Sequence, residues 1–528
     1  MEIVWGLAVE SSCALSSTTE PAHAPAIATA TRPTQSALFI LIARSFPRFQ
    51  PGHILARLRG VTTARSGDPA TRPRGLWHAA GAVDYLDRLS TWAATTPLEV
   101  LPAAVRERAC LVIADSLGVT AHGMQAPEMR EFVARHLADE RSGRASVIGA
   151  GRRADPASAA LLNGTAGTWI DMNEGNLYAR GHPGIQVVPL AWALAEHEGR
   201  SGRELLAAFV AGYEVSARIK RSSATRLAVH PHGTFGTIGA AVALARLLGY
   251  TAAATREIIN VSATLGIAAS RRALTTGATV RNVYTGLSGS MGWLAHTLVQ
   301  SGFTGEPDAV SSVYGAIYAD RFDTDAAVSG LGEEFLLPRG FIKVHACGRY
   351  IHGALDCVET LTTRHHLPPD SIQAISVRTY ALAASLGHAD VRSEFGARFS
   401  LPFAVASLLC HGRSGLDNYV AAAVADPRIQ ALARRVEVVE DPEFTRAFPE
   451  RQPTEVMLVL ADGTEMSERS DFHRGEAENP HPPDAVRKKF LDLSAPVWGR
   501  GRAEVLFDRV LDLERVPDVA ALLGNASV

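Results

Sequence analysis

The chain is organised around one polar stretch, Ile170-Asp171-Met172-Asn173-Glu174-Gly175-Asn176-Leu177-Tyr178-Ala179-Arg180-Gly181-His182-Pro183-Gly184, which lies between two apolar, alanine-rich runs. The flanking runs have the composition of buried helices, and the glycines and the proline break the helical pattern between them. A polar loop between two hydrophobic helices is a common position for catalytic side chains. The pattern therefore favours a helical fold that presents Asp171 and His182 in one loop.

Capping and termination signals predict a series of helices on both sides of this loop. Asp155 before Pro156 is typical of a helix start, and Ser201 with Glu204 forms a capping-box pattern. We expect helices over residues 98–117, ending at Gly118, and over 157–164, 187–198, 201–219, 234–248 and 286–300. No convincing strand pattern occurs before about residue 335, so this part of the chain is predicted to be all-helical.

The pattern changes after Pro338. Residues 372–380, 436–439 and 456–460 are strand candidates, and 461–464 carry an Asp-Gly turn signal typical of a hairpin. Helical patterns at 352–363 and 402–410 alternate with them. The predicted fold class is mainly α, with a large all-helical domain at 83–338 and a smaller α+β lid domain at 339–470. Residues 471–528 are predicted to form helical segments that return to the helical domain.

Residues 1–82 differ in composition from the rest, and we expect them to be a poorly ordered N-terminal extension. No acidic residue occurs between Pro21 and Gly67, and the apolar run at 37–43 is too short to span a membrane. An acid-poor, Arg- and Ser-bearing start resembles an organelle transit peptide. A start site assigned too far upstream, with Val83 among the alternatives, is the simpler explanation. We therefore expect a cytoplasmic protein, or a mitochondrial one if the extension is a genuine transit peptide.

The overall composition is that of an ordinary globular protein. Hydrophobic residues make up 47% of the 528 residues, and the formal net charge of −2 argues against nucleic acid or a membrane as a partner. The five cysteines are scattered without a CxxC pair, so we expect neither a disulfide framework nor an iron–sulfur cluster. The sequence shows no phosphate-binding loop and no dinucleotide fingerprint.

Four later stretches have the same character as the central loop. They are 229–236 with His230 and His232, 275–286 with Arg281 and Tyr284, 342–352 with Lys343 and His352, and 399–403. Only four of the 52 basic residues are lysines, which draws attention to Lys343. Any single histidine is explained as well by a helix cap, and His230 with His232 is a weak metal site because no third ligand lies near them in the sequence.

Taken together, these residues suit proton transfer next to a carboxylate. The histidines supply imidazoles for acid–base chemistry, and Asp171 can orient one of them. Arg281 and Lys343 can hold substrate carboxylates. Chemistry of this kind requires neither a redox cofactor nor a metal.

These motifs, in this order, resemble the MmgE/PrpD family. The matching segments are Asp171 with His182-Pro183, then Gly212-Tyr213-Glu214-Val215, His230 before Gly-Thr-Phe-Gly-Thr, Arg281-Asn282-Val283-Tyr284-Thr285-Gly286, and Lys343 with Cys347 and His352. The family includes 2-methylcitrate dehydratase, cis-aconitate decarboxylase and an iminodisuccinate epimerase. The resemblance implies a metal-free homodimer with a cleft between two domains and a small polycarboxylate as the substrate.

The resemblance also implies roles for individual residues. It assigns catalysis to Asp171, His182, His230 and His352, and substrate binding to Arg281, Tyr284 and Lys343. The decarboxylase of the family has threonine where Gly175 stands and one residue fewer before the position of His182. It also has lysine where Arg281 stands and histidine where Tyr284 stands.

Arginine is a poor proton donor, so the replacement of the decarboxylase's lysine by Arg281 argues against decarboxylation. We expect a hydratase or dehydratase that acts on a small hydroxy di- or tricarboxylic acid. The alternatives are an epimerase, a decarboxylase and a catalytically idle protein that binds a carboxylate.

Overall fold

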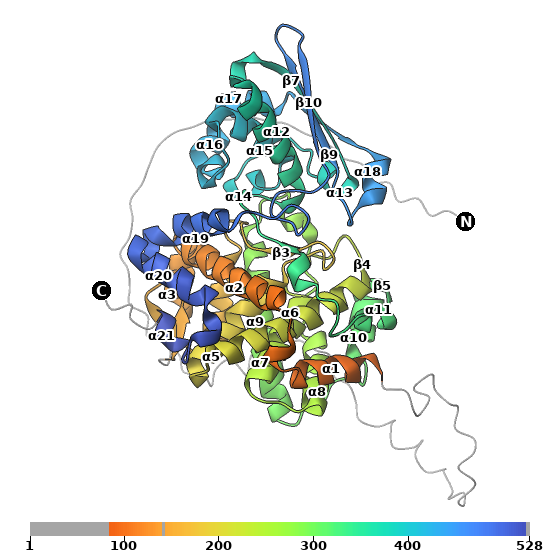
Figure 1. The fold of residues 1–528 in the computed structure, drawn as a ribbon, viewed down its shortest axis with the longest axis vertical. Helices are drawn as coiled ribbons and strands as arrows, with labels where there is room; N and C mark the ends of the chain where they lie inside the picture. The colour runs from red at the N-terminus through yellow and green to blue at the C-terminus, as the bar shows by residue number, and fades with distance from the viewer. Residues whose placement is uncertain (1–83, 140–142, 524–528) are drawn as a thin grey trace, which may run out of the picture. The chain divides into compact units, whose positions relative to one another are not determined.

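Long helices dominate the structure, and a single four-stranded sheet stands in the second half of the described chain (Figure 1). The computed structural model describes residues 84–139 and 143–523, so the expected extension at 1–82 lies outside the described residues. Within the described ranges, no helix is long and apolar enough to cross a membrane. The predicted mainly α fold class is confirmed.

The first part of the chain folds into helices whose ends follow from local sequence signals. Asp155 accepts hydrogen bonds from the backbone of Ala157 and Ser158, the predicted capping box joins Ser201 and Glu204, and Gly199 ends its helix with φ 64°. The helices are α1 (Tyr85–Thr95), α2 (Ala103–Gly123), α3 (Pro127–His136), α4 (Pro156–Gly167), α5 (Pro183–Glu198), α6 (Gly202–Ser222), α7 (Phe235–Leu247), α8 (Ala252–Thr264), α9 (Val283–Gln300), α10 (Ala309–Ser312) and α11 (Thr324–Val328).

The predicted helix end at Gly118 is wrong. Helix α2 continues to Gly123, and Gly118 lies in its buried interior. A Cβ at this position would be 3.0 Å from Cδ2 of Phe490, so glycine here makes room for a packed ring rather than ending the helix.

Helices α5 and α7 form the centre of the helical part. Every residue of α5 from Pro183 to Glu196 is buried, as is every residue of α7 from Phe235 to Ala245. A helix that is apolar on all sides needs neighbours on all sides, and α6 and α9 pack against both while α4 packs against α5. Both central helices therefore begin deep inside the protein.

Short strands interrupt the helices, so the all-helical prediction for the first part is wrong in detail. The pairs are β1 (Ala145–Val147) with β2 (Arg152–Ala154), β3 (Gly175–Asn176) with β6 (Gly340–Phe341), and β4 (Ser223–Thr225) with β5 (Ala319–Phe322). Strands of two to four residues are too short to produce a recognisable alternating pattern. The β3–β6 pair joins the central loop to the chain just before Lys343.

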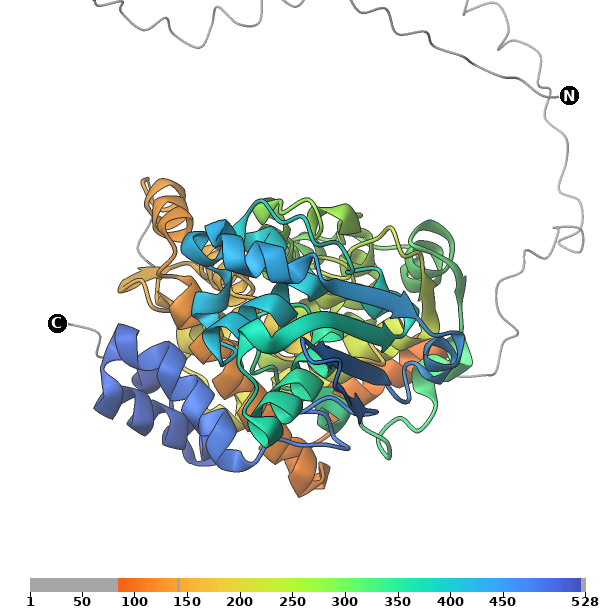
Figure 2. The same ribbon diagram turned by 90° about the horizontal axis from the view of Figure 1, so that it is seen from above.

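The four-stranded sheet has the order β10-β9-β7-β8, from β7 (Ile372–Thr379), β8 (Val436–Glu440), β9 (Thr454–Leu460) and β10 (Glu465–Ser470). The β7–β8 pair is parallel and the other pairs are antiparallel; Figure 2 shows the strands side by side. Alternate residues of β9 are buried, because α12 (His352–His365) packs on β9 and β10, and α15 (Leu401–His411) packs on β8. The predicted strands and hairpin are confirmed. The shorter helices are α13 (Ala381–Ala384), α14 (Glu394–Ala397), α16 (Ala421–Ala425), α17 (Pro427–Ala433) and α18 (Pro442–Ala447).

Three further helices follow the sheet: α19 (Pro483–Trp498), α20 (Arg500–Leu511) and α21 (Ala520–Leu523). Lys489 of α19 reaches Asp115 of α2, with Nζ 2.5 Å from Oδ1, and also donates to the carbonyl oxygen of Met172 at 2.6 Å. The other oxygen of Asp115 accepts the backbone N–H of Glu174 at 3.0 Å. A buried ion pair thus holds the backbone of the central loop at two points.

Candidate active site

Three loops that lead into helices meet at one cavity. His182 directly precedes α5, His230 and His232 lie shortly before α7, and Arg281 lies in a 3-10 turn, Thr279–Asn282, before α9. These side chains line one cavity together with Asp171 and Lys343. Helix N-termini carry partial positive charge and unpaired N–H groups, so the cavity favours anions.

Asp171 is the centre of the charge network in this cavity. Its Oδ1 accepts a hydrogen bond from Arg281 Nη2 at 3.1 Å, and its Oδ2 accepts one from Lys343 Nζ at 2.9 Å. Burial alone would raise the pKa of this carboxyl group, but the positive charges of Lys343 and Arg281 outweigh burial and hold the pKa below its usual value. One carboxylate thus faces two cations.

Asp171 also has a strained backbone. Its φ of 52° lies in the left-handed region, which non-glycine residues adopt rarely and at an energetic cost. The conformation directs the carboxylate between Arg281 and Lys343. Strain of this kind is concentrated at functional positions in proteins.

The two cations are fixed by further contacts. Lys343 Nζ donates to the carbonyl oxygen of Cys347 at 3.2 Å, and the guanidinium of Arg281 lies over the Phe399 ring, 5.6 Å from its centre. Burial lowers the pKa of Lys343, although the charge of Asp171 opposes this shift. Both cations are therefore pre-positioned for a carboxylate ligand.

His182 is set up to accept a proton. Its Nδ1 lies 2.5 Å from the carbonyl oxygen of Glu174. A carbonyl oxygen only accepts, so Nδ1 carries the hydrogen and Nε2 keeps its lone pair. Burial, and then the charge of Lys343, lower the pKa of His182 to about 3, so the ring is neutral at neutral pH.

His230 lies on the other side of the histidine cluster. Its Nδ1 accepts the backbone N–H of His232 at 3.1 Å, and its Nε2 lies 3.3 Å from Arg281 Nε. A neutral imidazole has one acceptor nitrogen, so the backbone N–H of His232 and the Nε–H of Arg281 compete for it. Burial and the charge of Arg281 lower the pKa of His230 well below its ordinary value.

Sequence reasoning gave His232 no role in catalysis. Its ring lies edge to face with His230 and His182, at centroid distances of 4.7 and 5.0 Å. Its Nδ1 is 2.8 Å from Thr285 Oγ1, but its buried Nε2 has no partner within the described chain. An unpaired buried nitrogen costs about 1–3 kcal/mol, which makes His232 a candidate ligand contact. The sequence feature that could have identified His232 as a site residue is its position two residues after His230.

Two predicted residues do not reach the cavity. His352 is fully buried at the start of α12, where its Nδ1 accepts from Arg349 Nη1 at 3.2 Å. Tyr284 packs against the His230 ring at a centroid distance of 5.6 Å. Arg349 lines the cavity, whereas His352 and Tyr284 do not, so both support residues that do.

Gly175 occupies a position with no room for a side chain. A Cβ here would lie 2.4 Å from Cζ of Phe341 and 2.7 Å from Nδ1 of His182. Phe341 is the strand partner of Gly175 in the β3–β6 pair. Any larger residue at 175 would displace the phenylalanine ring or the histidine.

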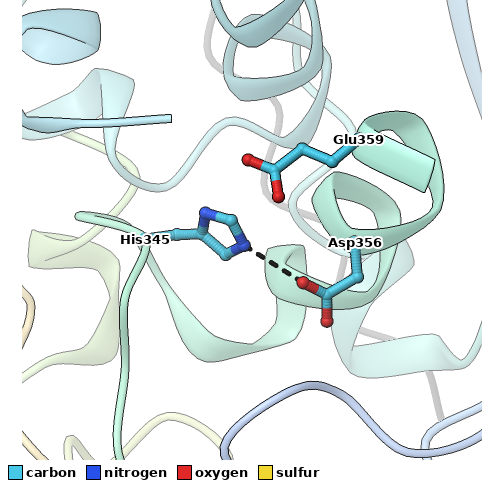
Figure 3. Close-up of side chains that lie close together, drawn as sticks. All are labelled: His345, Asp356 and Glu359. Carbon is cyan, nitrogen blue, oxygen red and sulfur yellow. Dashed lines mark hydrogen bonds and ion pairs between the residues drawn. The ribbon is translucent and has the colours of Figure 1, made fainter. Parts of the chain in front are cut away.

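His345, Asp356 and Glu359 form the group of potential metal ligands in the described residues (Figure 3). His345 Nε2 lies 3.1 Å from Asp356 Oδ1. Arg474 already compensates the two acids: its Nε donates to Asp356 Oδ1 at 2.6 Å, and its Nη2 donates to Glu359. A metal ion at this group would have to displace the Arg474 guanidinium, so these residues fit an ion-pair network better than a metal centre.

Proteins of known name resemble this chain over most of its length. The cis-aconitate decarboxylase of Aspergillus terreus is 23% identical over 464 residues, which are 82% of this chain and 94% of the relative. The cis-aconitate decarboxylase of Mus musculus is 26% identical over 388 residues, 70% of this chain and 78% of the relative. The mitochondrial 2-methylcitrate dehydratase of Yarrowia lipolytica is 23% identical over 363 residues, 61% of this chain and 66% of the relative.

The two domains of one family account for nearly all of the described chain. The MmgE/PrpD N-terminal domain matches residues 87–325, which contain Asp171, the three clustered histidines and Arg281. The MmgE/PrpD C-terminal domain matches residues 345–513, which contain the sheet and α19. The chain therefore belongs to the MmgE/PrpD family.

Proposed function

We propose that this protein is a cofactor-independent lyase that removes water from, or adds it to, a small hydroxy di- or tricarboxylic acid. The observation that supports this most directly is the position of Asp171 between Arg281 and Lys343, in one cavity with the neutral imidazoles of His182 and His230. The cations suit a substrate carboxylate, and an imidazole suits removal of a proton next to it. The names of the relatives, a polycarboxylate dehydratase and polycarboxylate decarboxylases, support the same class of reaction.

In this proposal Arg281 and Lys343 bind one carboxylate of the substrate. His182 Nε2 takes the proton from the neighbouring carbon, and the electron pair of that C–H bond forms the C=C bond. The C–O bond on the next carbon breaks, and the hydroxyl group leaves as water with a proton from His230. Asp171 keeps both cations in position and stabilises the positive charge that develops on His182, and hydration is the reverse sequence.

Substrate charge prepares His230 as the proton donor. In the free protein, burial and the charge of Arg281 keep this ring neutral. A bound polycarboxylate compensates Arg281 and Lys343 and therefore raises the pKa values of the nearby histidines. Binding should be accompanied by proton uptake, which calorimetry in buffers of different ionisation enthalpy measures.

The substrate is found by screening hydroxy di- and tricarboxylic acids for absorbance of a new conjugated alkene. On that substrate, His230→Gln should reduce kcat by roughly 10²–10⁴-fold, the usual contribution of a general acid or base. Turnover by His230→Gln close to that of the unmodified protein would remove His230 from the mechanism.

Decarboxylation is the second candidate, because the relatives include named cis-aconitate decarboxylases. The same cations would hold the substrate, and the product would be CO₂ in place of water. An epimerase would instead incorporate deuterium from D₂O without forming an alkene or CO₂. Tight binding of a polycarboxylate without any turnover would identify a catalytically idle member.

The other parts of the proposal concern assembly and location. We propose a cytoplasmic homodimer that binds no nucleic acid, as the resemblance and the near-neutral charge imply. Sedimentation of the full chain at several concentrations tests the dimer. A concentration-independent monomer mass would contradict it.

A further inference from the structure

We infer that the cavity contains a second anion-binding group, formed by Arg180 and Arg271, which selects substrates that carry a second, distal carboxylate. This inference rests on the proposed polycarboxylate chemistry. It extends that chemistry from the reacting end of the substrate to the opposite end.

Arg180 and Arg271 come from separate loops but line the same cavity as Asp171. The guanidinium of Arg180 lies 6.0 Å from the centre of the Phe448 ring, and that of Arg271 lies 6.0 Å from the centre of the Tyr350 ring. These two rings are themselves 6.1 Å apart. The two arginines therefore adjoin one aromatic pair.

Neither arginine has an acidic partner among the residues that the structure describes. By contrast, Arg349 lines the same cavity but is bonded to Glu476 at 2.7 Å, so its charge is compensated. The side chains of Arg180 and Arg271 make no hydrogen bond within residues 84–139 and 143–523. A guanidinium binds a carboxylate through two parallel N–H groups, so two unpaired arginines lining one cavity suit a carboxylate ligand.

The cavity thus carries two separate centres of positive charge. At the inner centre, Asp171 compensates one of the two charges of Arg281 and Lys343. At the outer centre, the charges of Arg180 and Arg271 are uncompensated. A monocarboxylate can occupy only one centre, whereas a di- or tricarboxylate can bridge both, so the outer centre should discriminate between them.

Calorimetric titration of the full chain with tricarballylate, glutarate and butyrate tests this assignment independently of turnover. The variants are Arg180→Gln and Arg271→Gln. The matched control is Arg272→Gln, because Arg272 follows Arg271 in the same 3-10 turn, is exposed and does not line the cavity. Each cavity variant should weaken the binding of tricarballylate and glutarate roughly tenfold to a hundredfold, the loss of charge-assisted hydrogen bonds, and should reduce their advantage over butyrate, while the control variant leaves the binding of all three acids unchanged.

The outcomes separate this inference from the proposed function. Tricarballylate binding that is equal in the unmodified protein and in both cavity variants would overturn the second anion group and leave the proposed function standing. Binding of none of the three acids by the unmodified protein would overturn both. An equal loss in Arg272→Gln would show a general charge effect and overturn the assignment. A last outcome concerns inorganic phosphate. If Arg271→Gln weakens the binding of phosphate but does not weaken the binding of tricarballylate, the group recognises phosphate, and the carboxylate assignment is overturned.

Discussion

Replacing Lys489 with methionine should destabilise the central loop strongly. Methionine keeps the apolar stem but leaves Asp115 as a buried carboxylate and the carbonyl oxygen of Met172 without its donor. Removing one partner of a buried ion pair costs about 3–5 kcal/mol. Local relaxation and entry of water around Asp115 offset part of this cost, so we expect a loss at the lower end of the range, about 3 kcal/mol.

The loss is measured as the shift in the urea midpoint, followed by tryptophan fluorescence and by far-UV circular dichroism. If the two probes report the same unfolding transition, the m-value, which is the slope of the unfolding free energy against urea concentration, converts the midpoint shift into a change in the free energy of unfolding. The matched control is Lys488→Met, because Lys488 is exposed on the same helix and pairs with Asp492 at the surface, where an ion pair contributes little. Equal shifts in the two variants would refute the argument that the buried pair holds the loop.

Three further predictions concern the site. Burial and the charge of Lys343 lower the pKa of His182 to about 3, so kcat/KM, which reports the free protein, should not decline as the pH falls from 8 to 5; a decline near pH 6.5 would contradict this. Asp171→Asn keeps the shape and tolerates the left-handed φ but removes the charge between the cations, so kcat should fall about 10²-fold without a rise in KM. An unchanged kcat would remove Asp171 from the mechanism. His352→Gln should reduce kcat less than His230→Gln, because His352 contacts Arg349 rather than the cavity, and equal losses in steady-state assays would place it in the cavity.

Helix boundaries were predictable where the signal is local. Asp155 and Ser201 act on backbone groups within a few residues, and the structure confirms both. Gly118 shows the limit of such signals, because its reason is the distant Phe490 ring. The strand pairs β1–β2, β3–β6 and β4–β5 were missed for a related reason: each depends on its partner rather than on its own sequence pattern.

The part of the candidate site that could be predicted is the set of residues that belong to the family motifs, because those motifs occur in the expected order along the chain. Asp171, His182, His230, Arg281 and Lys343 do line one cavity. The sequence had no means of showing that His232 lies between two other histidines, or that Arg180 and Arg271 adjoin the same aromatic pair. Those facts depend on how separate loops meet at the starts of α5, α7 and α9, which residue spacing does not encode.

The crowding around Gly175 also limits how members of this family can evolve into one another. A threonine at this position, as in the decarboxylase, is incompatible with the present Phe341 ring and with the present place of His182. A single mutation from glycine to threonine would therefore pass through a protein with a displaced histidine. A smaller residue at 341 would have to come first as a permissive change, so positions 175 and 341 should vary together across related sequences. The two-residue strand pair β3–β6 thus couples the residue that position 175 can accept to the size of the side chain at position 341.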